Sequence, residues 1–163
     1  MNLCSPREIR ILLESRGLRP CRGLGQNFLA DRNILAAILE AAQVTSRDHV
    51  LEVGPGLGVL TEGLLQQAGR VTAVEKDAGL HAFLAERWAA DPRLTLLRAD
   101  VLDLDLAELF RNGVTCLVSN LPYHVGTPLL IKWLTGPWTP HALTLMFQKE
   151  VAQRVAADVG EDA

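Results

Sequence analysis

The chain has 163 residues, of which 48% are hydrophobic and 21% are charged. This composition supports one compact domain with a buried core and excludes a disordered tail or a coiled coil. No apolar run approaches the ~20 residues that cross a bilayer, and the first residues, MNLCSPREIR, lack the apolar segment of a signal peptide. The three cysteines are odd in number and far apart, so they predict neither a disulfide framework nor a zinc site. We therefore expect a cytoplasmic protein that binds no metal and does not enter a membrane.

The net charge of −3 is unevenly distributed along the chain. Six arginines and three acidic residues give residues 1–33 an excess of three positive charges, and the remaining residues are acidic overall. A basic segment ahead of an acidic body suggests an anionic partner near the N-terminus. A solvated helix face would explain the same charges equally well.

The N-terminal part is predicted to hold two helices joined by a basic arm. The first helix covers 5–16, with Ser5 as its N-cap. An arginine- and glycine-rich arm follows over 17–28, and Asp31 is placed to cap a second helix over 32–43. The side chains expected to face inward from this second helix are Ile34, Leu35, Ile38 and Leu39.

After these helices, apolar strand-like segments alternate with helical patterns five times. The expected strands are 49–54, 70–76, 94–100, 115–120 and 142–148. The expected helices are 57–68, 77–90, 105–111, 126–135 and 149–157. Such alternation predicts an α/β fold with a mostly parallel sheet, helices on both faces, and a ligand site at the carboxyl ends of the strands.

The end of the first predicted strand is rich in glycine, with the sequence EVGPGLG over 52–58. Alternate glycines allow the backbone to approach a ligand closely and to turn sharply into a helix. The dinucleotide fingerprint GxGxxG would require glycine where Val59 stands, and Pro55 removes an N–H that a diphosphate would use. The loop favours a nucleoside ligand, with a tight turn that binds nothing as the alternative.

Acidic residues end the next two predicted strands. Glu75 is placed to accept hydrogen bonds from both ribose hydroxyls, although a carboxylate at a helix start would look the same. Asp100 is placed to accept from the exocyclic amine of a purine, while Val101 packs on the ring. A helix cap within a run of acids is the other interpretation of Asp100.

The fourth predicted strand ends in Asn120, Leu121, Pro122 and Tyr123. The Asn side-chain oxygen and a backbone carbonyl would be two acceptors, which matches the two donors of an exocyclic amino group. Tyr123 offers a flat face on which a base can stack. The sequence therefore suggests a site for a planar ring with an amino group, and an Asx-Pro turn is the alternative.

These motifs together resemble those of methyltransferases that use S-adenosylmethionine (SAM) and act on amino nitrogens. Three further stretches, GQNFL at 25–29, Leu60-Thr61 and FQKEVA at 147–152, narrow the resemblance to the ribosomal RNA adenine N6-dimethyltransferases, over about residues 5–155. Within that family the chain is most similar to the small-subunit (16S) enzymes whose loss confers kasugamycin resistance.

The resemblance implies dimethylation of two adjacent adenines in a loop near the 3′ end of small-subunit ribosomal RNA. The implied SAM-binding residues are Asn27, Leu29, Gly54, Gly56, Glu75, Lys76, Asp100, Val101 and Asn120. The implied catalytic residues, which hold the target N6 and its base, are Asn120, Leu121, Pro122 and Tyr123. The implied RNA-binding residues are Arg19, Arg22, Gln26 and Phe28.

The resemblance also implies two domains, a helix with a basic arm over 1–33 and a SAM-binding methyltransferase domain over 34–163. The sequence predicts five strands where the family has seven followed by a helical domain, so we expect an incomplete methyltransferase domain with an exposed apolar edge at 142–148. This shortening leads us to expect that the SAM pocket is kept and that most productive ribosomal RNA binding is lost. The sequence does not predict an oligomeric state.

Three alternative functions remain. The first is the related large-subunit adenine methyltransferase that confers macrolide resistance and shares most of these motifs. The second is a nicotinamide-dependent dehydrogenase, which has no use for the sequence Asn-Leu-Pro-Tyr. The third is a non-catalytic RNA-binding or ribosome-assembly factor with the same fold.

Overall fold

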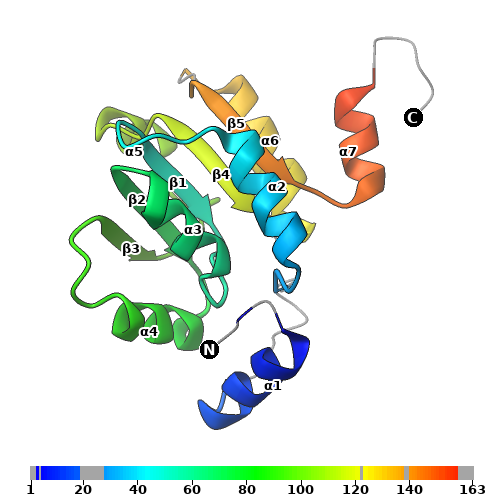
Figure 1. Ribbon diagram of the computed structural model, residues 1–163. Coiled ribbons are helices and arrows are strands. Elements are labelled where there is room, and N and C mark those ends of the chain that lie inside the picture. The colour runs from blue at the N-terminus through cyan, green and yellow to red at the C-terminus, as the bar shows by residue number, and fades with distance from the viewer. Residues whose placement is uncertain (1–2, 4, 19–27, 122, 138–139, 158–163) are drawn as a thin grey trace.

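The computed structural model describes residues 3, 5–18, 28–121, 123–137 and 140–157. Its centre is a five-stranded parallel sheet with the order β3-β2-β1-β4-β5. The strands are β1 His49–Val53, β2 Arg70–Glu75, β3 Leu94–Arg98, β4 Cys116–Asn120 and β5 Ala142–Met146. Chain order reverses at β1, whose neighbours are β2 on one side and β4 on the other (Figure 1). The predicted α/β class and all five strands are confirmed.

The helices also follow the predicted order. They are α1 Pro6–Ser15, α2 Arg32–Ala42, α3 Val59–Gln67, α4 Ala78–Arg87, α5 Leu106–Arg111, α6 Tyr123–Thr135 and α7 Lys149–Ala156. Helix α6 begins at Tyr123, three residues before its predicted start at 126. The end of β4 is therefore followed almost directly by a helix, which brings the Asn-Leu-Pro-Tyr sequence to a strand-to-helix turn.

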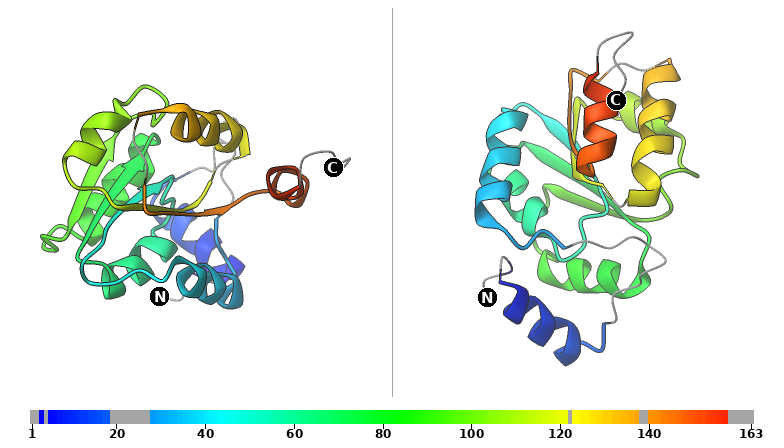
Figure 2. Two further views of the ribbon diagram at one scale, coloured as in Figure 1. Left: turned by 90° about the horizontal axis from the view of Figure 1, so that it is seen from above. Right: turned by 90° about the vertical axis from the view of Figure 1, so that its right-hand side faces the viewer.

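The side chains of the sheet pack against a layer of helices on each face (Figure 2). One core contains residues of α1, α2 and α3 with Val50, Val71 and Val118 from alternate strand positions. The other core contains residues of α5 and α6 with Leu51 and Leu117. This alternation follows from the two-residue period of a strand, and it explains why the central strands are apolar on both faces.

The N-terminal helices show how local signals decide helix ends. Asp31 caps α2 as predicted, because its Oδ1 accepts from Asn33 N at 2.7 Å and from the next N–H at 3.3 Å. Ser5 lies at the N-cap position of α1, but its side chain makes no capping hydrogen bond. The inward prediction for Ile34 is wrong, since 42% of this residue is exposed. It lies in the first turn of α2.

Helix α1 is attached to the body of the protein by both apolar and polar contacts. Ile9, Leu12 and Leu13 belong to the same core as α2 and α3. The Arg16 guanidinium contacts the Glu86 carboxylate of α4 at 2.6 Å and lies over the Phe83 ring. The predicted division of the chain after residue 33 stays a prediction.

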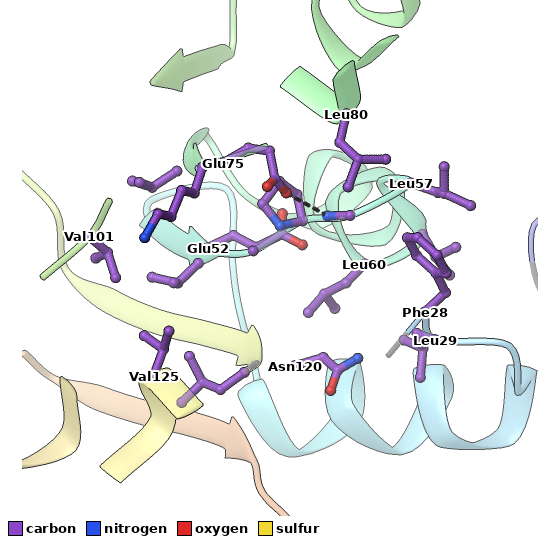
Figure 3. Close-up of a pocket in the computed structure, with 18 of the residues that line it drawn as sticks. Phe28, Leu29, Glu52, Leu57, Leu60, Glu75, Leu80, Val101, Asn120 and Val125 are labelled. Carbon is purple, nitrogen blue, oxygen red and sulfur yellow. Dashed lines mark hydrogen bonds between the residues drawn. The ribbon is translucent and has the colours of Figure 1, made fainter. Parts of the chain in front are cut away.

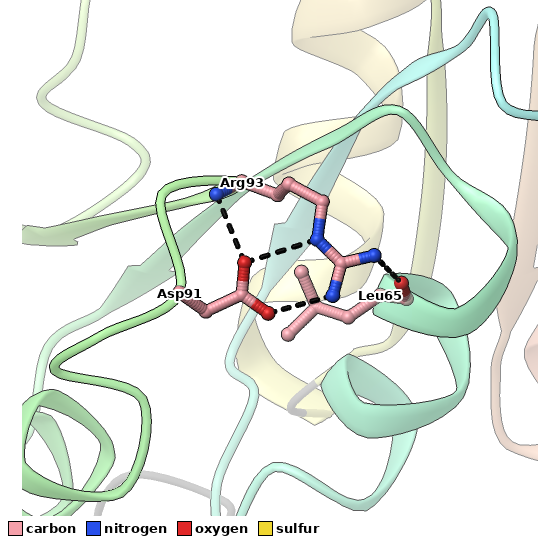
Figure 4. A network of polar contacts seen from close by, with 3 residues as sticks. All are labelled: Leu65, Asp91 and Arg93. Carbon is pink, nitrogen blue, oxygen red and sulfur yellow. Dashed lines mark hydrogen bonds and ion pairs between the residues drawn. The ribbon is translucent and has the colours of Figure 1, made fainter.

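A polar network fixes the turn from α4 into β3 against the end of α3 (Figure 4). Arg93 forms a two-bond pair with the carboxylate of Asp91, with Nε–Oδ1 at 3.0 Å and Nη2–Oδ2 at 2.7 Å. Its remaining nitrogen, Nη1, donates to the carbonyl of Leu65 at 2.6 Å. One guanidinium thus satisfies an unpaired carbonyl in the last turn of α3 and orders the approach to β3.

Strand β5 ends the described sheet, and among the described strands it pairs only with β4. Leu143 and Leu145 reach the α5–α6 core, while Met146 packs on the opposite core. Helix α7 lies beyond β5 and away from both helix layers (Figures 1 and 2), and none of its residues is buried. Among the described residues, no helix is long and apolar enough to cross a membrane.

Helix α2 packs closely on α3 because glycine at position 63 has no Cβ. A Cβ added at Gly63 would lie 2.6 Å from Cδ1 of Leu39. We compare the effect of Gly63→Ala on the free energy of unfolding in two backgrounds. This effect should be more stabilising by about 1–3 kcal/mol in the Leu39→Ala background than in the unchanged protein, because truncating Leu39 removes the clash and alanine is the better helix former. Urea unfolding of the four proteins of this cycle measures the coupling, and additive effects would contradict the expected contact.

Candidate functional site

A pocket lies at the carboxyl ends of the central strands, where the predicted fold places a ligand site (Figure 3). Its empty space, including solvent at the open mouth, is about 870 Å³. Every predicted site residue with a described side chain lines it. These residues are Phe28, Leu29, Gly54, Gly56, Glu75, Lys76, Asp100, Val101, Asn120 and Leu121.

The glycine loop after β1 forms one wall of this pocket through backbone conformations that favour glycine. Gly54, Gly56 and Gly58 have φ values of +66°, +61° and +79°. The N–H of Gly58 donates to the Pro55 carbonyl at 2.8 Å, which closes a tight turn before α3. A Cβ added at Gly58 would lie 2.4 Å from the Trp88 ring, so this glycine is required by packing as well as by its φ value.

The Glu75 carboxylate joins the glycine loop to the turn that follows β2. Its Oε2 accepts from Gly56 N at 3.2 Å (Figure 3), and its Oε1 accepts from Asp77 N at 2.8 Å. Burial raises the pKa of Glu75 above its ordinary value, although these two N–H groups oppose the shift. Asp77 in turn caps α4 by accepting from Gly79 N and Leu80 N. The loop, the acid and the start of α4 are thus one connected unit.

A second acid, Glu52, lies in the pocket and was not singled out from the sequence. It is 1% exposed, and its Oε2 accepts from the Thr61 hydroxyl of α3 at 2.7 Å. Burial raises its pKa to about 8, and the nearby charge of Glu75 adds to the shift. The sequence contains a signal that could have identified Glu52, because it is a carboxylate inside an otherwise apolar strand.

The purine-binding residues predicted at the end of β3 lie beside Lys76. The Lys76 ammonium contacts Asp100 Oδ2 at 2.7 Å, and Asp100 Oδ1 accepts from Leu102 N at 3.0 Å. Asp100 therefore does not cap α5, which is capped by Asp105. Val101 is buried and presents an apolar surface to the pocket next to this carboxylate.

Strand β4 brings Asn120 to the pocket, and a hydrogen bond to β1 fixes its end. The buried Ser119 hydroxyl donates to the Val53 carbonyl at 2.6 Å. Leu121 is buried, and its N–H donates to the Met146 carbonyl of β5 at 3.4 Å. The strand-to-helix turn therefore rests on both neighbouring strands.

A second pocket of about 630 Å³ opens beside the first. The two pockets share Phe28, Leu29 and Asn120. Its other walls are Ala30, Asp31, Ile34, Met146 and Phe147. Met146 and Phe147 were not predicted as site residues. Their position depends on β5 lying next to β4, and a predicted list of strands does not include the order of the strands in the sheet.

Six predicted site residues are incompletely described. Arg19, Arg22, Gln26, Asn27 and Pro122 lie outside the described residues, and Tyr123 is described only as the first residue of α6. Phe28, predicted to contact RNA, packs against the glycine loop, 3.3 Å from a Cβ position at Gly56. No cluster of three or more potential metal ligands occurs within the described ranges.

Comparison with known proteins gives consistent matches. The family model for ribosomal RNA adenine dimethylase matches residues 21–163. Ribosomal RNA small subunit methyltransferase A of Phenylobacterium zucineum is 56% identical over 155 residues, which cover 95% of this chain and 54% of the relative. The protein of the same name from Deinococcus radiodurans is 45% identical over 160 residues, covering 98% and 53%. The chain thus spans about half the length of these curated relatives.

Solved structures agree with these sequence matches. A dimethyladenosine transferase from Plasmodium falciparum superimposes with a TM-score of 0.70 at 30% identity, covering 80% of this chain and 46% of that one. The 23S rRNA methyltransferase ErmE superimposes with a TM-score of 0.69 at 30% identity, covering 84% and 54%. The chain belongs to the ribosomal RNA adenine dimethylase family.

Proposed function

We propose that this chain binds SAM in the first pocket and transfers its methyl groups to the N6 atoms of two adjacent adenines in small-subunit (16S) ribosomal RNA, in the cytoplasm. The observation that carries the proposal is the position of Asn120 at the junction of two pockets. An acceptor at such a junction can contact a methyl donor on one side and a target base on the other.

The residues of the first pocket fit the parts of SAM. Glu75 can accept from ribose hydroxyls, and its backbone partners already hold it at the pocket wall. Asp100 can accept from the adenine amine while Val101 packs on the ring. The glycine loop and Leu29 leave room for the methionine part of SAM. We propose Asn27 as a further contact to this part of the ligand. Bound SAM would supply an activated methyl group, so the protein needs no metal or covalent nucleophile.

The second pocket suits a flat base. Phe28, Met146 and Phe147 provide apolar surface of the kind on which an extruded base packs. The Asn120 oxygen and a backbone carbonyl of Leu121 or Pro122 would accept the two N6 hydrogens, which draws the nitrogen lone pair out of conjugation and stabilises positive charge on N6. We propose Tyr123 as the stacking residue, and Arg19, Arg22 and Gln26 as contacts to RNA phosphate.

The small-subunit target is favoured by the relatives. Those at 45–56% identity are named as small-subunit methyltransferases, whereas the large-subunit enzyme ErmE is 30% identical. A non-catalytic role is less well supported, because a factor that only bound RNA would have no need for the second pocket beside Asn120.

Glu75 is the residue through which SAM binding can be tested most directly. We expect Glu75→Ala to weaken SAM binding by roughly 100-fold, because two charge-assisted hydrogen bonds to ribose are lost and the glycine loop is released. Calorimetric titration of SAM into the 163-residue chain measures this loss. Glu62→Ala is the matched control, since Glu62 pairs with Arg87 on the surface of α3. Equal affinity of Glu75→Ala and the unchanged chain would contradict the assigned role.

The roles of the two pockets can be separated by a substitution that affects the second pocket alone. A Cβ at Gly126 of α6 would lie 2.8 Å from Cε1 of Phe147, so Gly126→Ala must displace this ring. We expect methyl transfer to small-subunit RNA to fall roughly tenfold or more at saturating SAM, because a misplaced base loses its alignment. SAM affinity should be unchanged. Thr127→Ala, at an exposed neighbouring position, is the control; unaltered transfer by Gly126→Ala would contradict the base site.

A further inference from the structure

The Glu52 carboxyl group lines the first pocket but has no role in the function proposed above. It is almost completely buried at the end of β1, and Figure 3 shows it near Glu75. Its hydrogen bond from Thr61 occupies Oε2. Among the described residues, no second hydrogen bond to this carboxyl group is found. A buried acid with so little support is costly to ionise unless a positive charge approaches it.

Among the residues that the structure describes around Glu52, none supplies that positive charge. From α3 it faces the neutral Thr61, and from β4 the neutral amide of Asn120 lines the same pocket. From β2 it faces Glu75, which is acidic, and the neighbouring Lys76 ammonium is paired with Asp100. The pocket therefore holds more acidic than basic groups, and it complements a ligand that carries positive charge.

We propose that Glu52 is a proton-linked binding residue, which is neutral in the free protein and gives up its proton when a cationic methyl donor enters the pocket. The inference rests on the proposed function and deepens it, since it names the feature of the ligand that the site recognises. The proton passes from the carboxyl group to solvent, and the resulting carboxylate faces the positive charge of the ligand.

The size of the effect follows from the burial of this group. Its pKa of about 8 means that most molecules carry the proton at pH 7. A cation within a few ångströms favours the carboxylate form and lowers that pKa. Binding at pH 7 should therefore release close to one proton per ligand, whereas a ligand without positive charge should release none from this group.

The test is calorimetric titration of the 163-residue chain at pH 7 in phosphate and in Tris, whose ionisation heats differ widely. SAM is compared with 5′-methylthioadenosine, which keeps the nucleoside but lacks both the sulfonium and the ammonium group. We expect the heat of SAM binding to depend on the buffer with the sign of proton release, and the heat of methylthioadenosine binding to be independent of it. This comparison needs no variant.

Variants then assign the proton to its residue. Glu52→Gln should abolish the buffer dependence and weaken SAM binding roughly tenfold or more while leaving methylthioadenosine affinity unchanged. Glu62→Gln makes the same chemical change on the surface of α3 and should behave like the unchanged chain. Buffer-independent SAM binding, or proton release that survives Glu52→Gln, overturns the role of Glu52 alone. No binding of either ligand overturns the proposed function and this inference with it.

The free protein offers a separate check that requires no ligand. Between the ordinary pKa of 4.5 and about 8, the folded state holds a proton on Glu52 that the unfolded state has lost, so folding becomes less favourable as pH rises through this range. Glu52→Gln removes this dependence. We expect the variant to melt like the unchanged chain at pH 5 and at a higher temperature at pH 8. A melting difference that does not change with pH contradicts a neutral Glu52.

Discussion

The contact between the Glu75 carboxylate and the backbone N–H of Gly56 determines the shape of the site. The glycine loop has three positive φ values and few side chains to fix it, so its position depends on hydrogen bonds from outside the loop. Glu75 supplies one of these and binds Asp77 N with its other oxygen. The end of β2 and the start of α4 are therefore linked to the loop by hydrogen bonds through Glu75. A ligand that donates hydrogen bonds to Glu75 joins an arrangement that already exists, which lowers the entropy lost on binding.

The two acids of this pocket differ because their surroundings differ. Glu75 accepts from the backbone N–H groups of Gly56 and Asp77, whereas within the described part of the chain the partner of Glu52 is the Thr61 hydroxyl. Hydrogen bonds from N–H groups favour a carboxylate, and burial without them favours the neutral acid. Adjacent strands thus present a hydrogen-bond acceptor for a neutral ribose and an acid that ionises only against a cation. One pocket can in this way distinguish two chemically different parts of a single ligand.

The sequence was sufficient for the order of helices and strands, because apolar periodicity and turn residues are local signals. It also predicted that residues at the ends of β1, β2, β3 and β4 would lie together, and they line one pocket because parallel strands bring their carboxyl ends to one edge. It failed where the answer depends on which elements are neighbours. Ile34 was expected inside but borders the second pocket, and Phe147 reaches that pocket because β5 pairs with β4. The early start of α6 was missed because Pro122 suggested an extended turn.

The Lys76–Asp100 pair is consistent with the adenine site predicted from the sequence. Both oxygens of Asp100 already have partners, Lys76 Nζ on Oδ2 and Leu102 N on Oδ1. These two contacts fix the direction of the carboxylate at the pocket wall. The carboxylate therefore has a fixed position beside the buried Val101, which is the arrangement that the proposed adenine contact requires.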